Sequence, residues 1–441
     1  MAHPRGAVWP LAATALVVAS ALAARPALID GGTGGAITTA RLVVTRTYLL
    51  GGPLFNLLDL LTLLSVRQHI AIGVTTIATA MLVAAVRTRR AAPRTLTRHA
   101  VHYGATVGVA LAGVLSLYAT GILVPRPMAS LSLGDPAELA IDVHSHTDAS
   151  HDGRAGFGPE ENRAWHQAAG FAAAYVTDHR SFDAAASGAR MNPRASGERT
   201  VLLSGIETVY AGAHLNVLGA TIADSAIDHG GHLDRVALGT APREDRGPAL
   251  SILTIPADLE RIPRGARLRG IELSDAAPRG IEAGSSHRAR ILRLADSLNL
   301  ALVAGSDNHG WGRTAAAWTV MRIPGWRELS PAALDRAIRT SLDRQRRGAT
   351  SIVDRAAVRQ PRNALELAAT APMALWGMFV TISPIERVMW VAWAWAAWLA
   401  LKLFADARTR LGTESRAAKR PMLAPIAGQS RRRPALKPAR G

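Results

Sequence analysis

The sequence predicts an α/β protein in which a distorted (β/α)7 barrel of the TIM type is inserted between helical membrane spans. Two observations support this prediction. Apolar runs of about 20 residues, the length that crosses a bilayer, lie towards both ends of the chain and are missing between about 139 and 354. In that middle region, short β-rich runs alternate with helical patterns, which is typical of βα units and a parallel sheet.

Composition narrows the class of protein further. The chain has 441 residues and no cysteine, which excludes a disulfide scaffold, a cysteine nucleophile, an iron–sulfur cluster and a thiolate zinc site. Its formal net charge is +18, and arginine makes up most of the basic residues. Much of this arginine flanks apolar runs or lies in the tail, where the lipid bilayer is the expected partner. Aromatic residues are only 5% and are not interleaved with basic ones, so nucleic-acid binding is not expected.

Four membrane spans are predicted in the N-terminal region, residues 1–125. They are the apolar runs 7–24, 47–66, 70–86 and 101–124. The first run also fits a cleaved signal peptide, because Ala21-Leu22-Ala23 offers a small-residue cleavage site. Two further spans, 365–382 and 388–404, are predicted within residues 363–405, and the basic tail 406–441 is expected to be disordered.

The chain is therefore expected to be an integral protein of a bacterial inner membrane. With six spans, two charge signals in the sequence predict opposite orientations of the chain. The arginines of the loop 87–98 favour the cytoplasm and would place the barrel outside it, whereas a cytoplasmic basic tail would place the barrel inside. Because short loops usually outweigh long tails, we expect an extracytoplasmic barrel.

The barrel is predicted to occupy residues 138–355. Its seven strands are expected at 139–144, 174–177, 201–206, 215–219, 250–255, 270–273 and 300–304. Helices are expected at 159–172, at 286–298, and from Ser330-Pro331 towards Arg346. An open doubly wound sheet is the alternative to a barrel.

Ionisable residues recur where the predicted strands end, and in a barrel these ends converge on one face. The recurring residues are His144, His146, Asp178, His179, Glu207, His214, Asp307 and His309. Residues two apart in a strand project to the same side, so His144 and His146 can hold one ion together. Imidazole mixed with carboxylate, without thiolate, indicates a catalytic site for Zn²⁺, Mn²⁺ or Fe.

Taken in order, these motifs resemble those of the PHP superfamily (polymerase and histidinol phosphatase). The opening motif is similar to Asp142-Val143-His144-Ser145-His146-Thr147, followed by Ser150-His151-Asp152-Gly153. The later motifs are similar to Thr177-Asp178-His179, Gly205-Ile206-Glu207, His214-Leu215-Asn216-Val217-Leu218-Gly219, Gly270-Ile271-Glu272 and Gly305-Ser306-Asp307-Asn308-His309. The resemblance covers about 144–310 and none of the membrane spans.

The resemblance implies a PHP-type barrel with two or three divalent metal ions. It implies a first ion bound by His144, His146, Glu207 and Asp307. Glu207 would bridge to a second ion that His214 also binds, and a third ion would be bound by Asp152, His179 and His309.

One position departs from the family pattern. The family commonly has His-Pro after the fifth strand, whereas this chain has Ile255-Pro256, and isoleucine cannot be a ligand. Asp258 lies close by in the sequence, but its direction is open. The departure favours a two-metal mechanism over a three-metal one.

The resemblance also implies hydrolysis of a small-molecule phosphate ester. Two cations joined by a carboxylate lower the pKa of a water molecule towards about 7, and this water would attack phosphorus. Asp178 is the candidate catalytic residue, either orienting His179 or moving a proton. Arg180 and Arg313 are candidate substrate-binding residues, because a guanidinium can grip phosphate with two hydrogen bonds.

Two other functions stay open at this point. A metallohydrolase of the same fold could cleave an ester, amide or carbamate, as one branch of the superfamily is thought to do. A degenerate barrel could instead serve a non-enzymatic membrane scaffold or sensor, which Ile255 would favour. The oligomeric state is not fixed by the sequence.

Overall fold

The structure of the chain is a computed structural model. It describes residues 7–89, 95–179, 181–210, 213–221, 249–254 and 267–418, apart from the side chains of residues 210 and 409–418. The chain divides into two compact units, one of Leu16–Trp390 and one formed by Met1–Ala15 with Val391–Gly441. The first unit contains the central sheet and the candidate site.

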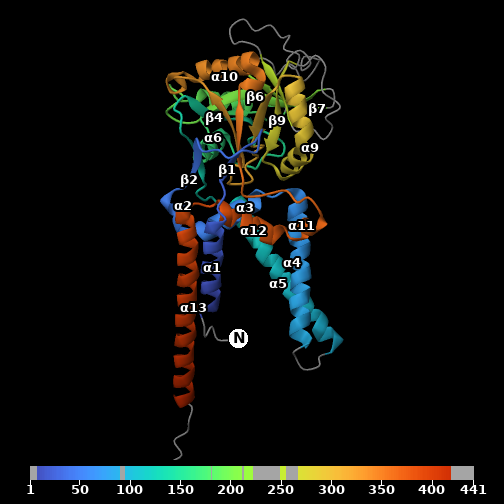
Figure 1. Cartoon of the computed structure of the whole chain (residues 1–441), viewed down its shortest axis with the longest axis vertical. Helices are drawn as coiled ribbons and strands as arrows, with labels where there is room; N and C mark the ends of the chain where they lie inside the picture. Colours follow the sequence, from blue (N-terminus) through green and yellow to red (C-terminus); the bar gives the residue numbers. More distant parts are fainter. Residues whose placement is uncertain are drawn as a thin grey trace, which may run out of the picture. The chain divides into compact units, whose positions relative to one another are not determined.

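A ten-stranded mixed sheet forms the core of the larger unit, in the order β1-β12-β11-β4-β5-β6-β7-β8-β9-β10 (Figure 1). All seven predicted strands are present: β4 (Glu138–Ser145), β5 (Ala173–Val176), β6 (Val201–Tyr210), β7 (Ala213–Leu218), β8 (Leu250–Leu253), β9 (Leu268–Asp275) and β10 (Ala301–Gly305). Three further strands extend the β4 edge: β1 (Leu28–Asp30), β11 (Ala317–Arg322) and β12 (Ser351–Arg355). A separate antiparallel pair joins β2 (Ala40–Val43) to β3 (Ser130–Leu133).

The sheet differs from a regular (β/α)7 barrel in the middle of its order. Strands β4 to β6 and β8 to β10 pair in parallel, but β7 pairs antiparallel with both β6 and β8. Only residues 211 and 212 separate β6 from β7, too few for the helical crossover that a parallel pair needs. A hairpin therefore replaces one expected βα unit.

The sheet curls so that its two parallel halves approach each other. The N–H of Asp307, just after β10, donates to the carbonyl of His144 on β4 over 2.9 Å. In return, the N–H of His146 donates to the carbonyl of Asn308 over 3.0 Å. These hydrogen bonds bring the end of the last parallel strand against the end of the first.

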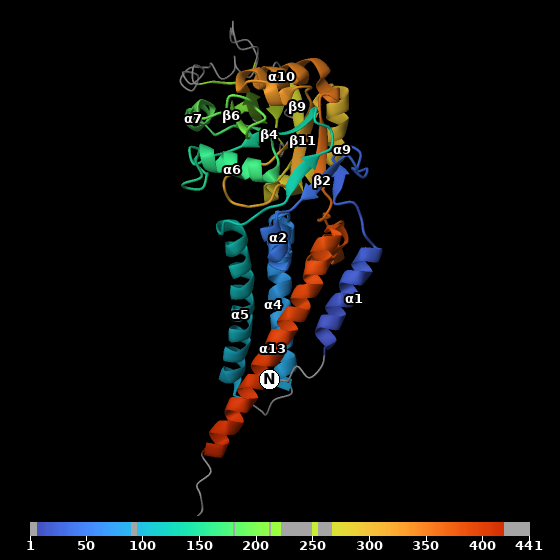
Figure 2. The same cartoon turned by 90° about the vertical axis from the view of Figure 1, so that its left-hand side faces the viewer.

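Within the described residues, the helices that cover the sheet are α6 (Pro159–Ala169), α7 (Asp183–Arg190), α9 (Pro278–Ser297) and α10 (Pro331–Gln345). Ser330 caps α10, as predicted, by accepting a hydrogen bond from the N–H of Ala333. Helix α9 begins at Pro278, earlier than the predicted start at 286. Figure 2 shows α6 and α9 on opposite sides of the sheet, with α10 across one end.

Alternation along β4 separates core residues from candidate site residues. Leu139, Ile141 and Val143 are buried in the same apolar cluster as Leu334 and Ile338 of α10. Since successive strand residues face opposite sides, the intervening Asp142 and His144 point away from that cluster, as does His146 beyond them. The core side of β4 thus fixes the direction of the candidate ligands.

Three helices among the described residues are long and apolar enough to cross a membrane. They are α4 (Val66–Arg89), α5 (Leu96–Leu123) and α13 (Pro384–Ala418), the last over Pro384–Arg408. The first predicted span is the shorter apolar helix α1 (Val8–Leu22). The long helices match the predicted spans 70–86, 101–124 and 388–404.

Two predicted spans, 47–66 and 365–382, are instead pairs of short helices. The first is split into α2 (Arg46–Leu50) and α3 (Gly52–Thr62), and the second into α11 (Ala364–Ala368) and α12 (Thr370–Thr381). Pro53 and Pro372 lie at or near the second helix starts, where a residue without an N–H interrupts the preceding helix. Helix α3 also buries Asn56 and Asp59, which an unbroken lipid-facing helix would not carry.

Candidate metal centre

Four ligand-type side chains meet at the end of β4. The Nε2 atom of His144 lies 3.0 Å from Oε2 of Glu207 on β6 and 3.4 Å from Oδ1 of Asp307. The Nε2 atom of His146 lies 3.2 Å from the same Glu207 oxygen and 3.4 Å from the same Asp307 oxygen. All four residues come from predicted motifs, and the structure brings them together.

The spacing of these four atoms suits one small divalent cation. Ligand atoms at about 2.0–2.1 Å from a tetrahedral zinc ion are about 3.3–3.4 Å apart. The four measured separations run from 3.0 to 3.4 Å. His144, His146 and Glu207 also form one of the groups whose donor atoms lie close enough to hold a metal ion.

Unused hydrogen-bonding atoms give a separate test of whether a metal fits. Both ring nitrogens of His146 and the Nε2 atom of His309 are buried without a hydrogen bond among the described residues. A buried polar atom without a partner costs free energy, so a missing ligand is the simplest account of it. The donor set therefore fits a metal ion.

Partners outside the cluster orient two of these imidazoles. The Nδ1 atom of His144 lies 3.0 Å from Oε1 of Glu272, a fully buried carboxylate on β9. The Nδ1 atom of His309 lies 2.9 Å from the carbonyl oxygen of Asp307 and can only donate to it. In both residues Nδ1 is engaged outside the cluster, which directs Nε2 towards a metal.

The pKa shifts of the ionisable groups in the centre indicate that it favours a bound cation. Burial lowers the pKa of His146, but the facing carboxylates of Asp307 and Glu207 outweigh burial and raise the pKa to about 9. Burial raises the pKa of Glu207, yet the facing imidazoles, His144 foremost, hold it well below its usual range. Positive charge is thus stabilised at this point, and a divalent ion would supply it in place of protons.

A second group uses the other oxygen of Glu207. Its Oε1 atom lies 2.8 Å from Nδ1 of His214 at the start of β7. The side chain of His214 is 54% exposed, so this position opens to solvent. Ile255 and Asp258, the residues in question for the second ion, lie outside the described residues.

A third group lies beside the first. The Nε2 atom of His309 is 3.2 Å from Asp152, and that of His179 is 3.9 Å from Asp152 and 3.5 Å from Glu207. The rings of His146 and His309 stack with centroids 4.0 Å apart. His146, His179 and His309 together form another group able to hold an ion. His151 is 75% exposed and forms a further such group with Asp152 and His179.

Two residues without an assigned role in the sequence motifs tie the ligand segments together. Asp142 accepts hydrogen bonds from the N–H groups of His144 (3.0 Å) and Ser306 (3.1 Å) through Oδ1. Its Oδ2 atom is 2.7 Å from Nε2 of His166 on α6. Both Asp142 and His166 are fully buried, so the pair couples β4, α6 and the segment after β10.

The candidate catalytic residue has different partners from those expected. Both carboxylate oxygens of Asp178 accept hydrogen bonds from Thr147, from its N–H over 2.6 Å and its hydroxyl over 2.7 Å. Burial raises the pKa of Asp178, and these two hydrogen bonds oppose the shift. Asp178 therefore fixes the loop after His146, and its role in proton transfer stays a prediction.

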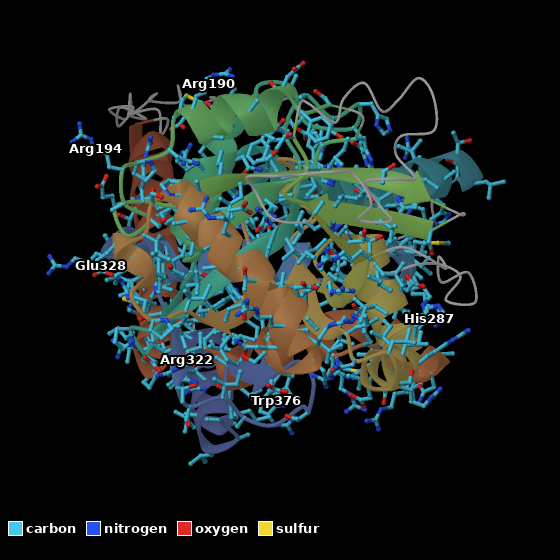
Figure 3. The ribbon with its side chains drawn as sticks, turned by 90° about the horizontal axis from the view of Figure 1, so that it is seen from above. Arg190, Arg194, His287, Arg322, Glu328 and Trp376 are labelled. Carbon is cyan, nitrogen blue, oxygen red and sulfur yellow. The ribbon has the colours of Figure 1, made fainter. Side chains whose placement is uncertain are left out.

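Of the two candidate substrate-binding arginines, only Arg313 lies within the described residues. Arg180 lies outside the described residues. Arg313 is half-buried and makes no ion pair with any described residue; burial and the nearby Arg154 and Arg126 lower its pKa. Arg154 lies between β4 and α6, in the segment that also carries Asp152, and its N–H donates to the carbonyl of His309 over 2.9 Å. Sequence motifs gave no signal for Arg154 because a loop arginine is common in this arginine-rich chain. His287, on α9, lies at the periphery (Figure 3).

Comparisons with known proteins give fold likenesses only. A scan against protein-family models and a search of curated proteins found no match. Among solved structures, PsfC from Pseudomonas syringae is 17% identical, with a TM-score of 0.35 over 54% of this chain and 96% of PsfC. An amidohydrolase from Chromobacterium violaceum, with bound sulfate and no metal, is 18% identical, with a TM-score of 0.26 over 43% of this chain and 98% of its own. At these TM-scores neither likeness bears on the activity of this chain.

Proposed function

We propose that the chain is a membrane-anchored, metal-dependent phosphoesterase. The observation that carries this proposal is the position of Glu207. Its Oε2 atom faces His144 and His146 over 3.0 and 3.2 Å, while its Oε1 atom faces His214 over 2.8 Å. A carboxylate whose two oxygens face different imidazoles could hold two divalent ions close together, the arrangement that two-metal hydrolases use.

The chain's own residues supply the rest of the site. When bound, divalent ions polarise an ester and make water a better nucleophile near neutral pH. Glu272 and the Asp307 carbonyl orient the ligating imidazoles of His144 and His309, so that little rearrangement is needed during reaction. Asp178 holds Thr147 and thereby the segment that leads to Asp152.

A phosphate ester is favoured over an uncharged ester or amide by the charge next to the centre. Arg154 lies between β4 and α6, and Arg313 lies after β10, close to it. Neither forms an ion pair with a described carboxylate. Their mutual repulsion, together with that of Arg126, would be relieved by a dianionic group. A carbonyl substrate would leave this repulsion in place.

The test is hydrolysis by the purified full chain in detergent, supplied with Mn²⁺ or Zn²⁺, of an aryl phosphate and of an aryl ester with the same leaving group. We expect the phosphate to be hydrolysed and the activity to fall at least 10²-fold in the double variant His144→Ala, His146→Ala. His287→Ala, at the periphery on α9, is the matched control and should keep its activity. Hydrolysis of the ester alone would replace the phosphoesterase by a carboxylic ester hydrolase, and retained metal and activity in the double variant would refute the centre.

We further propose that the barrel lies outside the cytoplasm, in a chain anchored in a bacterial inner membrane. With α4, α5 and α13 as the crossings, one crossing separates the barrel from the 87–98 loop and one separates it from the basic tail. Both arginine-rich segments can then be cytoplasmic together, in line with the tendency of positive loops to stay inside. The conflict that six spans would create is absent.

A further inference from the structure

The candidate metal centre opens into a cavity of about 520 Å³. Its lining includes Asp152, Asp307 and His309 from the first and third ligand groups. The volume lies in the range of about 300–1,000 Å³ that is usual for small-molecule sites. This cavity is therefore the space in which a substrate would meet the centre.

A second part of the lining belongs to the apolar helices. Leu61 and Thr62 come from the end of α3, His69 from α4, and Tyr118 with Ile122 from the end of α5. Figure 1 shows the ends of these three helices next to one another below the sheet. A water-soluble phosphate ester has no need of a cavity that runs from metal ligands to membrane-helix ends.

Buried contacts hold the helices in this place. Asp59 of α3 pairs with Arg126, just after α5, and Arg126 also donates to the Thr314 hydroxyl over 3.2 Å. Thr314 lines the cavity and donates to Asp59 over 2.9 Å. All of these side chains are buried. The ends of α3 and α5 are thus bonded directly to the segment after β10, which carries Asp307, His309 and Thr314.

The helices continue away from the cavity with apolar, exposed surfaces. On α5, Val109 is 74% exposed and Leu115 is 65% exposed, as expected for side chains that face lipid. A hydrocarbon chain in the membrane could therefore pass along α5 to Ile122 and Leu61 without crossing water. The phosphate at its end would then reach Asp307 and His309.

We propose that the substrate is an amphiphilic phosphate ester, with its phosphate at the metal centre and its hydrocarbon part against the ends of α3 and α5. This proposal rests on the proposed phosphoesterase function and names the substrate class of the same site. It also gives the membrane helices a role in binding in addition to anchorage.

The first experiment compares two esters with one headgroup, hexadecyl phosphate and butyl phosphate. The full chain is assayed in nanodiscs with Mn²⁺, and we expect kcat/KM to be at least tenfold higher for the hexadecyl ester. In Leu61→Trp and Ile122→Trp, which fill the membrane side of the cavity, the hexadecyl-to-butyl ratio should fall about tenfold. In Val109→Trp, on the lipid-facing side of α5, the ratio should be unchanged. Equal kcat/KM for both esters in the wild type would overturn the proposal.

The second experiment does not depend on turnover. A hexadecyl phosphonate with a diazirine in its tail, which cannot be hydrolysed, is cross-linked to the full chain, and labelled peptides are identified by mass spectrometry. We expect labelling of 58–62 and 118–122 to exceed labelling around Val109, and to drop at least fivefold in the His144→Ala, His146→Ala variant. The proposal is contradicted if labelling of 58–62 and 118–122 is no higher than labelling around Val109. It is also contradicted if the His144→Ala, His146→Ala variant is labelled as strongly as the wild type. Specific labelling without hydrolysis of either ester would leave amphiphile binding standing and refute the phosphoesterase function.

Discussion

The Nδ1 atom of His144 lies 3.0 Å from Oε1 of Glu272, whose side chain has no exposed surface. This contact keeps the Nδ1 proton in place and presents Nε2 to the candidate metal. We predict that Glu272→Gln lowers metal affinity about 10–100-fold, because the amide is a weaker acceptor for the imidazole. Metal titration of the full chain measures this. Glu198→Gln, at an exposed position, should bind as the wild type does, and equal affinity in both variants would remove Glu272 from the centre.

The close approach of β9 and β10 leaves no room beside Gly305. A Cβ atom at this position would lie 2.4 Å from Oε1 of Glu272 and 2.6 Å from Cβ of His144. We predict that Gly305→Ala separates these two side chains and lowers both metal content and melting temperature. Gly348→Ala meets nothing within 4 Å and serves as the control. Normal metal content in Gly305→Ala would show that the contact is dispensable.

The carboxylate of Asp59 pairs with the positive charges of two buried arginines. Arg126 and Arg355 are 2% and 8% exposed, and Asp59 pairs with both. Removing the carboxylate in Asp59→Ala leaves these charges without a partner, which should cost about 3–5 kcal/mol of stability. Asp296→Ala breaks an exposed pair with Arg347 and should cost less than about 1 kcal/mol. Thermal unfolding in detergent compares the two, and similar losses would contradict the role of Asp59.

Asp354 gives the fold a specific dependence on pH. Burial raises its pKa from 3.8 to about 6, although Ser274 donates to it over 2.9 Å. Folding therefore favours the protonated carboxyl, and the stability it contributes is full below 3.8 and is lost as the pH rises through about 6.

We expect Asp354→Asn to raise the melting temperature at pH 7.5, by the equivalent of about 1–3 kcal/mol, with a smaller gain at pH 4.5. Asp343 is the matched control, because its pairs with Arg269 and Arg267 outweigh burial and lower its pKa. Asp343→Asn should therefore destabilise the protein at pH 7.5. A gain for Asp354→Asn that does not change with pH would show that its ionisation is not the cause.

The absence of native cysteine allows a direct test of orientation. We predict that Ala189→Cys, exposed on α7, reacts with a membrane-impermeant maleimide in intact cells. Thr97→Cys, exposed at the start of α5, should react only after the membrane is permeabilised. The reverse pattern would place the barrel in the cytoplasm.

The strands and the ligand groups were predictable because both depend on local signals. The β-rich runs marked the seven strands from β4 to β10, and ionisable residues at or near the ends of these runs marked the candidate ligands His144, Glu207 and Asp307. The broken helices at 47–66 were not predictable, because the polar groups of α3 are satisfied by partners far away in sequence, such as Thr314 and Arg126. Strands β1, β11 and β12 were missed for the same reason, since they pair with strands far away in the sequence.

The hydrogen bonds between the end of β4 and the segment after β10 have a consequence for how the protein is made. His144 and His146 are synthesised before Asp307 and His309, so a growing chain cannot complete its candidate ligand set until synthesis has passed β10. A bound metal ion would then stabilise only those chains in which the end of β4 lies against the segment after β10. In cells starved of the metal, chains that lack this contact would accumulate and be sensitive to proteases.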